Sequence, residues 1–303
     1  MNVYKFPGPT SHDVVARLRR HLEKVRVGHA GTLDPLAEGV LLLCLGKATK
    51  FFDYLIECPK TYIATLRLGI VTTTQDTEGD IVSERPVGPV SAEVWRDLLK
   101  EFEGEIEQLP PMFSARRHQG RHLYDLARAG IEVERSPRRT WVESLELLSI
   151  EGPEVTFKVR CGRGTYIRTL CQDLGERFQT GGHMARLTRT AVGPFLAEDS
   201  ITLEAAEEHA IHGTLERLLT PVSRALTCLP EVRLGRLPPG GLRKGMWIGE
   251  KDLLDPAPEG RAGTHLRLLD GAGQTLALAR FVSGETFPMR VRKVLKTPLA
   301  VQT

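Results

Sequence analysis

The sequence has few cysteines and no long apolar run. Its 303 residues include five cysteines, which are scattered and form no C-x-x-C pair. No histidine pairs with them at zinc-finger spacing, so we expect reduced, buried thiols rather than a disulfide framework or a metal site. No stretch approaches the roughly 18–20 apolar residues of a membrane span, so we expect no membrane partner.

Two further features are missing: a targeting segment and an excess of one charge. The N-terminus MNVYKFPGPTSHD lacks the basic, apolar, small-residue order of a signal peptide, which predicts a cytoplasmic protein. The 41 Lys and Arg residues nearly balance 38 Asp and Glu residues, for a net charge of +3. Any surface that binds nucleic acid must therefore be local.

Apolar periodicity predicts a mixed α/β chain. Residues 40–45 form an apolar run between Gly39 and Gly46, which is typical of a buried strand. Residues 61–68 alternate cleanly, and we expect them to pair with a return strand over 72–82. Another alternating stretch covers 155–161, and the helices are expected over 10–25, 47–57, 91–102 and 167–178.

The pattern changes near residue 230, after which short apolar segments alternate with Gly and Pro. Residues 266–281 are typical of a hairpin. A length of 303 residues also favours one large and one small domain. We therefore expect a catalytic domain over 1–229 and a small β-rich domain over 230–303.

Asp34 is the first candidate for chemistry. It stands before Pro35 in the glycine-rich stretch GHAGTLDPLAEG, in a loop that leads into the strand over 40–45. An aspartate before proline is by itself consistent with a simple turn. A catalytic role needs partners elsewhere in the chain.

Longer motifs supply such partners. The string GHAGTLDPLAEGVLLLCLGKATK (28–50) closely resembles the central motif of the TruB-type tRNA pseudouridine-55 synthases. The resemblance continues over nearly all of 3–227, and residues 230–303 are similar, more loosely, to a PUA-like RNA-binding domain. The further matching motifs are TSHDVVARLRR (10–20), KTYIATLRLG (60–69), PPMFSARRHQGRHLYDLARAG (110–130), GRGTYIRTLCQDLG (162–175) and GGHMARLTRTAVGPF (181–195).

The resemblance implies a fold and an activity. The fold would be α/β (α+β), the pseudouridine synthase fold, with a large, mainly antiparallel mixed sheet flanked by helices. The activity would be isomerisation of uridine 55 in the T loop of tRNA, by base flipping, cleavage of the glycosidic bond and reattachment through C5. We accordingly expect tRNA as partner, a monomer with no protein partner, no metal and no cofactor.

The resemblance also implies roles for five residues. Asp34 would be the essential carboxylate, and Arg168 would pair with it. Tyr62 would stack on the flipped uracil and help to move a proton. Tyr166 and Leu187 would line the nucleoside pocket. Without the motif, a core position for Tyr62 is the simpler interpretation, because it shares a strand face with apolar residues.

RNA contacts are expected from a second group. His29 would help to hold the rearranged T loop. Asp76 is interpreted as a turn residue, because TTTQD departs from the family's T-D-T-x-D. An inserted segment over about 104–140 would grip the RNA backbone, and the backbone contacts expected are Lys5, Arg116, Arg117 and Arg121.

Two other functions stay open at this stage. An RNA-binding protein or RNA folding helper would use the same basic residues without catalysis. A glycoside or nucleoside hydrolase usually needs two carboxylates beside the bond, and only Glu38 lies close to Asp34 in the sequence.

Overall fold

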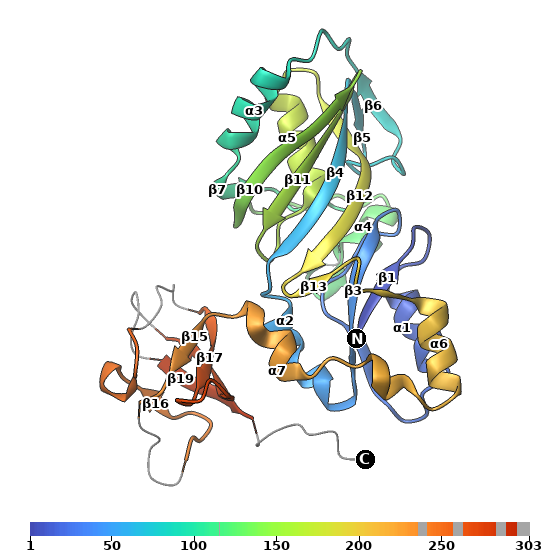
Figure 1. Cartoon of the computed structure of the whole chain (residues 1–303). Helices are drawn as coiled ribbons and strands as arrows, with labels where there is room; N and C mark the ends of the chain where they lie inside the picture. Colours follow the sequence, from blue (N-terminus) through green and yellow to red (C-terminus); the bar gives the residue numbers. More distant parts are fainter. Residues whose placement is uncertain (115, 236–240, 257–262, 283–288, 296–303) are drawn as a thin grey trace.

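The computed structural model describes residues 1–114, 116–235, 241–256, 263–282 and 289–295. Figure 1 shows a large curved sheet with helices against it, joined by the segment around α7 to a smaller β unit. No helix of the described residues combines the length and apolarity needed to cross a membrane.

Ten strands of the described chain form the large sheet, in the order β14-β1-β3-β12-β4-β11-β10-β7, with β13 beside β12 and β2 beside β3. Most pairs are antiparallel, while β1 with β14 and β3 with β12 are parallel. This confirms the expected mixed, mainly antiparallel sheet. The strands are β1 (Asn2–Lys5), β2 (Val27–His29), β3 (Glu38–Leu45), β4 (Lys60–Leu68), β7 (Gly104–Gln108), β10 (Arg138–Glu151), β11 (Glu154–Cys161), β12 (Gly182–Val192), β13 (Phe195–Leu196) and β14 (Ile201–Thr202).

Two groups of helices pack against this sheet, each near a different end of the strand order. Helices α3 (Ala92–Glu101) and α5 (Ile167–Arg177) share one apolar cluster with β4, β10 and β11. Helices α1 (Ser11–Arg19) and α6 (Leu203–Ile211) pack together against β1 and β3. The short helices are η1 (Gly46–Phe51), α2 (Phe52–Leu55), α4 (Leu123–Arg128), η2 (Leu215–Leu218), α7 (Val222–Ala225), η3 (Leu226–Cys228) and η4 (Glu250–Asp252).

Strand β3 is buried on both faces, which explains its unbroken apolar run. Leu41 and Leu43 pack in the cluster of α1, whereas Val40 and Leu42 pack in the cluster of α2. Because successive side chains of a strand point to opposite faces, a strand covered on both sides must be apolar at every position. The loop that carries Asp34 is thus anchored directly to the core.

The partner expected for β4 is wrong. Strand β4 pairs with β11 and β12, while β5 (Ile70–Thr72) pairs instead with β6 (Ile81–Glu84) in a separate two-stranded sheet. The alternation over 61–68 predicts a strand but carries no information on which distant strand completes its hydrogen bonds.

The smaller unit is a second sheet with its own core. Among the described residues its strand order is β15-β17-β18-β19-β16, around an apolar cluster that includes Phe281 and Met289. The hairpin predicted over 266–281 is confirmed as β17 and β18. The strands are β15 (Glu231–Arg233), β16 (Trp247–Ile248), β17 (His265–Leu269), β18 (Thr275–Phe281) and β19 (Met289–Val294). Parts of the expected domain over 230–303 lie outside the described residues.

A disulfide joins the turn between α2 and β4 to the segment before this second sheet. Cys58 and Cys228 are bonded, with their Cα atoms 5.4 Å apart and a separation of 170 positions in the sequence. The expectation that all cysteines are reduced thiols is therefore wrong, because their scatter along the sequence hides this proximity in space. Cys44, Cys161 and Cys171 are free and buried, as expected.

Candidate active site

Asp34 stands in the loop between β2 and β3, and buried polar contacts hold that loop in place. The hydroxyl of Ser11, in α1, accepts from the Leu33 amide at 2.8 Å and donates to the Leu33 carbonyl at 3.0 Å. The Nζ of Lys5, in β1, donates to the Pro35 carbonyl at 2.9 Å. The backbone is thus tied on both sides of Asp34, whose side chain stays 31% exposed.

Arg168 meets the Asp34 carboxylate with two parallel contacts. Its Nε donates to Oδ2 at 2.9 Å and its Nη2 donates to Oδ1 at 3.2 Å. The remaining N–H groups donate to the Thr74 carbonyl at 3.2 Å and the Phe113 carbonyl at 2.8 Å. A planar guanidinium used in this way fixes the orientation of the carboxylate. The structure thus brings together two residues that are 134 positions apart in the sequence.

Asp76 is a second carboxylate beside Arg168, and sequence reasoning missed it. It is 3% exposed, and its Oδ2 lies 3.7 Å from the Nε of Arg168. Its Oδ1 also accepts from the Glu78 amide at 3.0 Å and from the Thr74 hydroxyl, so the expected turn is present as well. The signal in the sequence is an acidic residue in a polar turn, which by itself points to no particular partner.

Tyr62 is buried in the middle of β4, between Val159 of β11 and Arg189 of β12. It belongs to the same apolar cluster as Leu33, the neighbour of Asp34. Burial raises the pKa of the Tyr62 phenol, while the charge of Arg189 opposes that rise. The phenol is therefore neutral at neutral pH, and the Asp34 charge acts on it.

Comparisons with known proteins agree along most of the chain. The model described as TruB family pseudouridylate synthase (N terminal domain) matches residues 19–167, and that described as tRNA pseudouridylate synthase B C-terminal domain matches 168–227. A tRNA pseudouridine synthase B from Clostridium kluyveri is 47% identical over 232 residues, 77% of this chain and 78% of its own. Its namesake from Thiobacillus denitrificans is 42% identical over 284 residues, 94% of this chain and 92% of its own.

The chain belongs to the TruB family. It is accordingly an isomerase, a pseudouridine synthase.

Solved structures share the fold of this TruB-family chain. A chain in "Crystal Structure of a Cbf5-Nop10-Gar1 Complex" matches with a TM-score of 0.68 and 28% identity, over 98% of this chain and 83% of that one. A chain in "Structure of H/ACA RNP bound to a substrate RNA containing 2'-deoxyuridine" matches with a TM-score of 0.65 and 26% identity, over 98% and 84%. The expected pseudouridine synthase fold is confirmed.

Two expected pocket residues of the TruB-family site lie near the Asp34–Arg168 pair. Tyr166 caps α5, and its amide donates to Oε1 of Gln108 at 2.9 Å. Burial raises the pKa of the Tyr166 phenol, on which the charges of Arg168 and Asp34 also act. Leu187 is buried in β12 and shares the apolar cluster of Tyr62. The roles of both residues stay predictions.

His29 lies on β2, next to the loop that carries Asp34. Burial lowers the pKa of its imidazole, and the charge of Arg189 acts in the same direction, so the ring is neutral at neutral pH. Its Nδ1 is buried without a hydrogen-bond partner within the described ranges. A neutral imidazole with an unused nitrogen can accept or donate one hydrogen bond to a ligand.

The expected RNA-gripping segment forms a small basic hairpin. Strands β8 (Arg117–His118) and β9 (Arg121–His122) are joined by Gln119 and Gly120, which both have positive φ, as in the tight turns that suit hairpins. Arg117 and Arg121 are exposed, and Arg116 is half-buried. A cavity of about 240 Å³ lies beside the hairpin, lined in part by Arg116, Arg135 and Arg138.

Lys5 is not where the expected RNA contact requires it. It is 1% exposed, and its Nζ also donates to the Ala37 carbonyl at 2.6 Å and the Phe6 carbonyl at 3.1 Å. This burial leaves no surface for a phosphate. The structure therefore places Lys5 inside the fold, as a support for the Asp34 loop.

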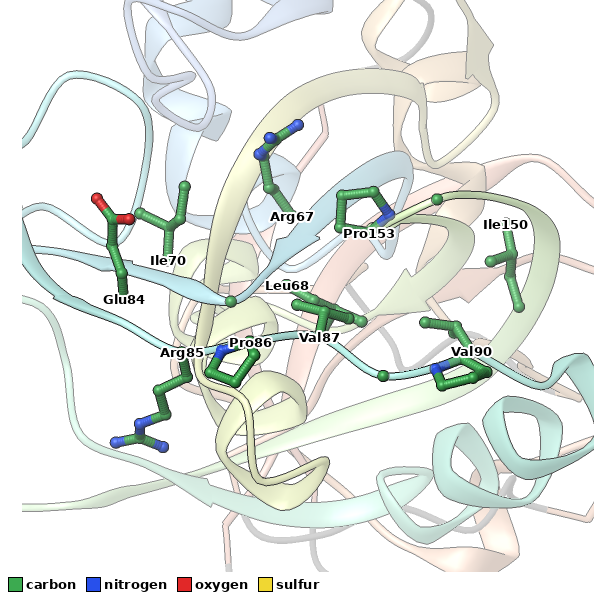
Figure 2. A pocket seen from close by; sticks show the side chains of 14 residues that line it. Arg67, Leu68, Ile70, Glu84, Arg85, Pro86, Val87, Val90, Ile150 and Pro153 are labelled. Atoms are coloured by element: carbon green, nitrogen blue, oxygen red, sulfur yellow. The ribbon is translucent and has the colours of Figure 1, made fainter.

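A larger cavity, of about 1000 Å³, lies away from these residues and contains none of them. Figure 2 shows Arg67, Ile70, Arg85, Val87 and Pro153 around it, where β4 ends and β5 begins. Its two arginines already pair with carboxylates. In the described part of the chain, no three His, Cys, Asp or Glu side chains gather closely enough to hold a metal ion.

Proposed function

We propose that this TruB-family enzyme isomerises uridine 55 in the T loop of tRNA, with Asp34 as the essential carboxylate. The observation that carries the proposal is the two-point contact of Arg168 with Asp34, at 2.9 and 3.2 Å, beside the buried Tyr62. The relatives that are 47% and 42% identical are named tRNA pseudouridine synthase B, which supports tRNA as the substrate.

The reaction breaks the N1–C1′ bond of uridine, turns the base and forms a C5–C1′ bond. The hydrogen on C5 leaves as a proton and N1 gains one, so no atoms or electrons are lost overall. Asp34 is the group that would face the nucleoside, because Arg168 is nearly enclosed. An ionised carboxylate can attack C1′, attack the uracil ring or remove a proton from the sugar, and all three paths suit this position.

The uridine must leave its stack before it can meet Asp34. Flipping a base costs a few kcal/mol, which contacts in the pocket must offset. The aromatic face of Tyr62 can stack on uracil, and its neutral phenol can exchange a proton at C5. Tyr166, Leu187 and His29 supply the remaining pocket and loop contacts.

Phosphate contacts would come from the β8–β9 hairpin. Arg116, Arg117 and Arg121 present a local cluster of positive charge in a chain whose net charge is only +3. Such contacts release counterions and make affinity depend on salt. Residues 230–303 would add RNA contacts as a PUA-like domain, separate from the catalytic domain over 1–229.

The test is to incubate unmodified tRNA with the purified chain and to map pseudouridine by position. We expect one modified site, uridine 55, and none in a matched transcript that carries cytidine there. Modification at another position would contradict the assignment of the substrate site. Free uracil in the products would show hydrolysis instead, and bound but unchanged tRNA would show a binding protein.

A further inference from the structure

Among the described residues, Arg189 is the largest charged side chain that the fold encloses almost completely. It lies on β12 and is only 1% exposed. Its backbone stands opposite Gly39 of β3 on one side and Tyr62 of β4 on the other. The residue therefore sits between the strand that follows the Asp34 loop and the strand that carries the active-site tyrosine.

The guanidinium of Arg189 is bound by backbone carbonyls on both sides of Asp34. Its Nη2 donates to the Gly31 carbonyl at 3.1 Å and its Nη1 to the Thr32 carbonyl at 3.2 Å. Its Nε donates to the Val40 carbonyl at 2.7 Å. A single rigid fork thus spans the loop from three residues before Asp34 to six residues after it.

Arg189 has no acidic partner among the described residues, unlike Arg168. Lys60 is a charged neighbour of Arg189. Burial is the main cause that lowers the pKa of Lys60 to about 8, and the positive charge of Arg189 lowers it further. A buried charge beside a like charge opposes folding, so this arrangement is a poor choice for stability alone. The hydrogen bonds of Arg189 to backbone carbonyls, rather than pairing with a carboxylate, therefore indicate its role.

The same residue is the cross-strand neighbour of Tyr62, because the two are paired in the register of β12 and β4. Burial raises the pKa of the Tyr62 phenol, and the charge of Arg189 opposes that rise. Gly39 has a φ of +107°, and a Cβ there would overlap the Arg189 carbonyl, so β3 and β12 are packed at the closest approach that glycine allows. One residue of a rigid strand therefore binds the backbone of the Asp34 loop and stands directly beside Tyr62.

We propose that Arg189 is a positioning residue for the isomerisation, which sets the distance between the Asp34 loop and the Tyr62 phenol. The inference rests on the proposed function, in which these two side chains act on the same flipped nucleoside. Lysine cannot replace the fork, because one ammonium group cannot hold carbonyls on both sides of the loop in the same planar arrangement.

The experiment compares Arg189→Lys and Arg189→Met with the wild-type chain under single turnover. The substrate is tRNA with tritium at C5 of uridine, because forming the C5–C1′ bond releases that tritium. We expect both variants to react about 100-fold more slowly, since a displacement near 1 Å at a reacting group costs that much. The affinity for tRNA should stay within about threefold, because neither change touches a surface that binds RNA.

Arg186→Met is the matched control. Arg186 lies on the same strand, but its side chain is 69% exposed and pairs with Glu154, so its loss should leave the rate within about twofold. The double variant Arg189→Lys with Tyr62→Phe should lose less than the product of the two single losses, because both changes disturb the same geometry.

Three results would overturn the inference. These are a rate within about threefold of wild type for Arg189→Lys, a loss confined to tRNA affinity, or failure of both Arg189 variants to fold, which would make the residue a requirement for folding. Wild-type and Asp34→Asn proteins run alongside. No tritium release from wild type, or normal release from Asp34→Asn, would overturn the proposed function instead.

Discussion

At the scale of single residues, exposure separates the two partners of the Asp34–Arg168 pair. The carboxylate side chain is 31% exposed and the guanidinium 6%. Arg168 is enclosed by carbonyl groups and by Asp76, so in the proposed reaction it would act on the substrate only through Asp34. Solvent, or a nucleoside bound in place of that solvent, would contact the carboxylate rather than the guanidinium.

Asp34→Asn is the direct test of that carboxylate. The amide keeps the shape of the side chain but can neither act as an anionic nucleophile nor as a base, so we expect no detectable pseudouridine. Affinity for tRNA should stay within about tenfold, or about 1.4 kcal/mol, because the fold and the basic hairpin are unchanged. Pseudouridine mapping and filter binding on one preparation measure both. Turnover at the wild-type rate would refute the role of Asp34.

At the scale of elements, the helix α5 that carries Arg168 also carries a carboxyl group whose burial opposes its ionisation. Burial raises the pKa of Asp173, in the middle of this helix, from 3.8 to about 6. The folded chain therefore binds the proton more tightly than the unfolded chain, and the free energy of unfolding falls as pH rises from 3.8 to about 6.

Asp173→Asn removes this penalty. At pH 7 we expect the variant to be more stable than the wild type by about 1 kcal/mol. At pH 4 the two should be equally stable, because the Asp173 carboxyl of the folded wild type is still protonated. Urea unfolding at the two pH values measures the difference. Asp97→Asn, at a side chain that is 76% exposed on α3, is the control and should change neither value. An equal effect at both pH values would contradict the assignment.

The β8–β9 hairpin makes a separate prediction about binding. Replacing Arg116 and Arg117 by Glu should weaken tRNA binding and reduce the slope of log affinity against log salt by about 1–2, since each phosphate contact contributes a little under 1. Titrations at several salt concentrations measure it. Arg160→Glu, at a half-buried arginine of β11 that pairs with Glu143, is the control. An unchanged slope would mean that the hairpin does not contact phosphates.

Elements were predicted well where local sequence decides them. The helix expected from residue 10 is present: Thr10 and Asp13 form a capping box, and α1 begins at Ser11. The helix stops at Arg19 rather than near residue 25, and the helix expected over 47–57 is the 3-10 helix η1 followed by one turn of α2. Periodicity identifies an apolar face but sets the ends of helices poorly, because capping and packing decide where they stop.

At the scale of the whole molecule, the Cys58–Cys228 disulfide closes a loop across most of the chain. A cross-link over 170 residues removes much of the freedom of the unfolded state, so its loss should cost about 2–4 kcal/mol. We expect a reducing agent to lower the melting temperature of the wild-type chain but not that of a Cys58→Ser, Cys228→Ser double variant. An equal decrease of the melting temperature in both proteins would contradict this prediction. Alkylation followed by mass spectrometry counts the free thiols before and after reduction.

Contacts between the two sheets also belong to this scale. The Nζ of Lys293, on β19, lies 3.7 Å from the centre of the Phe51 ring and donates to the Lys50 carbonyl at 2.7 Å. The rings of Tyr54 and His265 lie 4.7 Å apart. Figure 1 shows the second sheet next to the segment around α7. No local pattern in the sequence indicated this junction.

The sequence by itself determined the family and the apolar strands and singled out Asp34 as the candidate carboxylate, because motifs and alternation are properties of neighbours along the chain. The tertiary structure alone decided that β4 lies between β11 and β12, that Lys5 is enclosed, and that Asp76 and Arg189 stand beside the site. Those outcomes depend on hydrogen bonds and close packing between segments far apart in the chain. Such contacts form only when the strands pair, and no single stretch of residues determines which strands pair with one another.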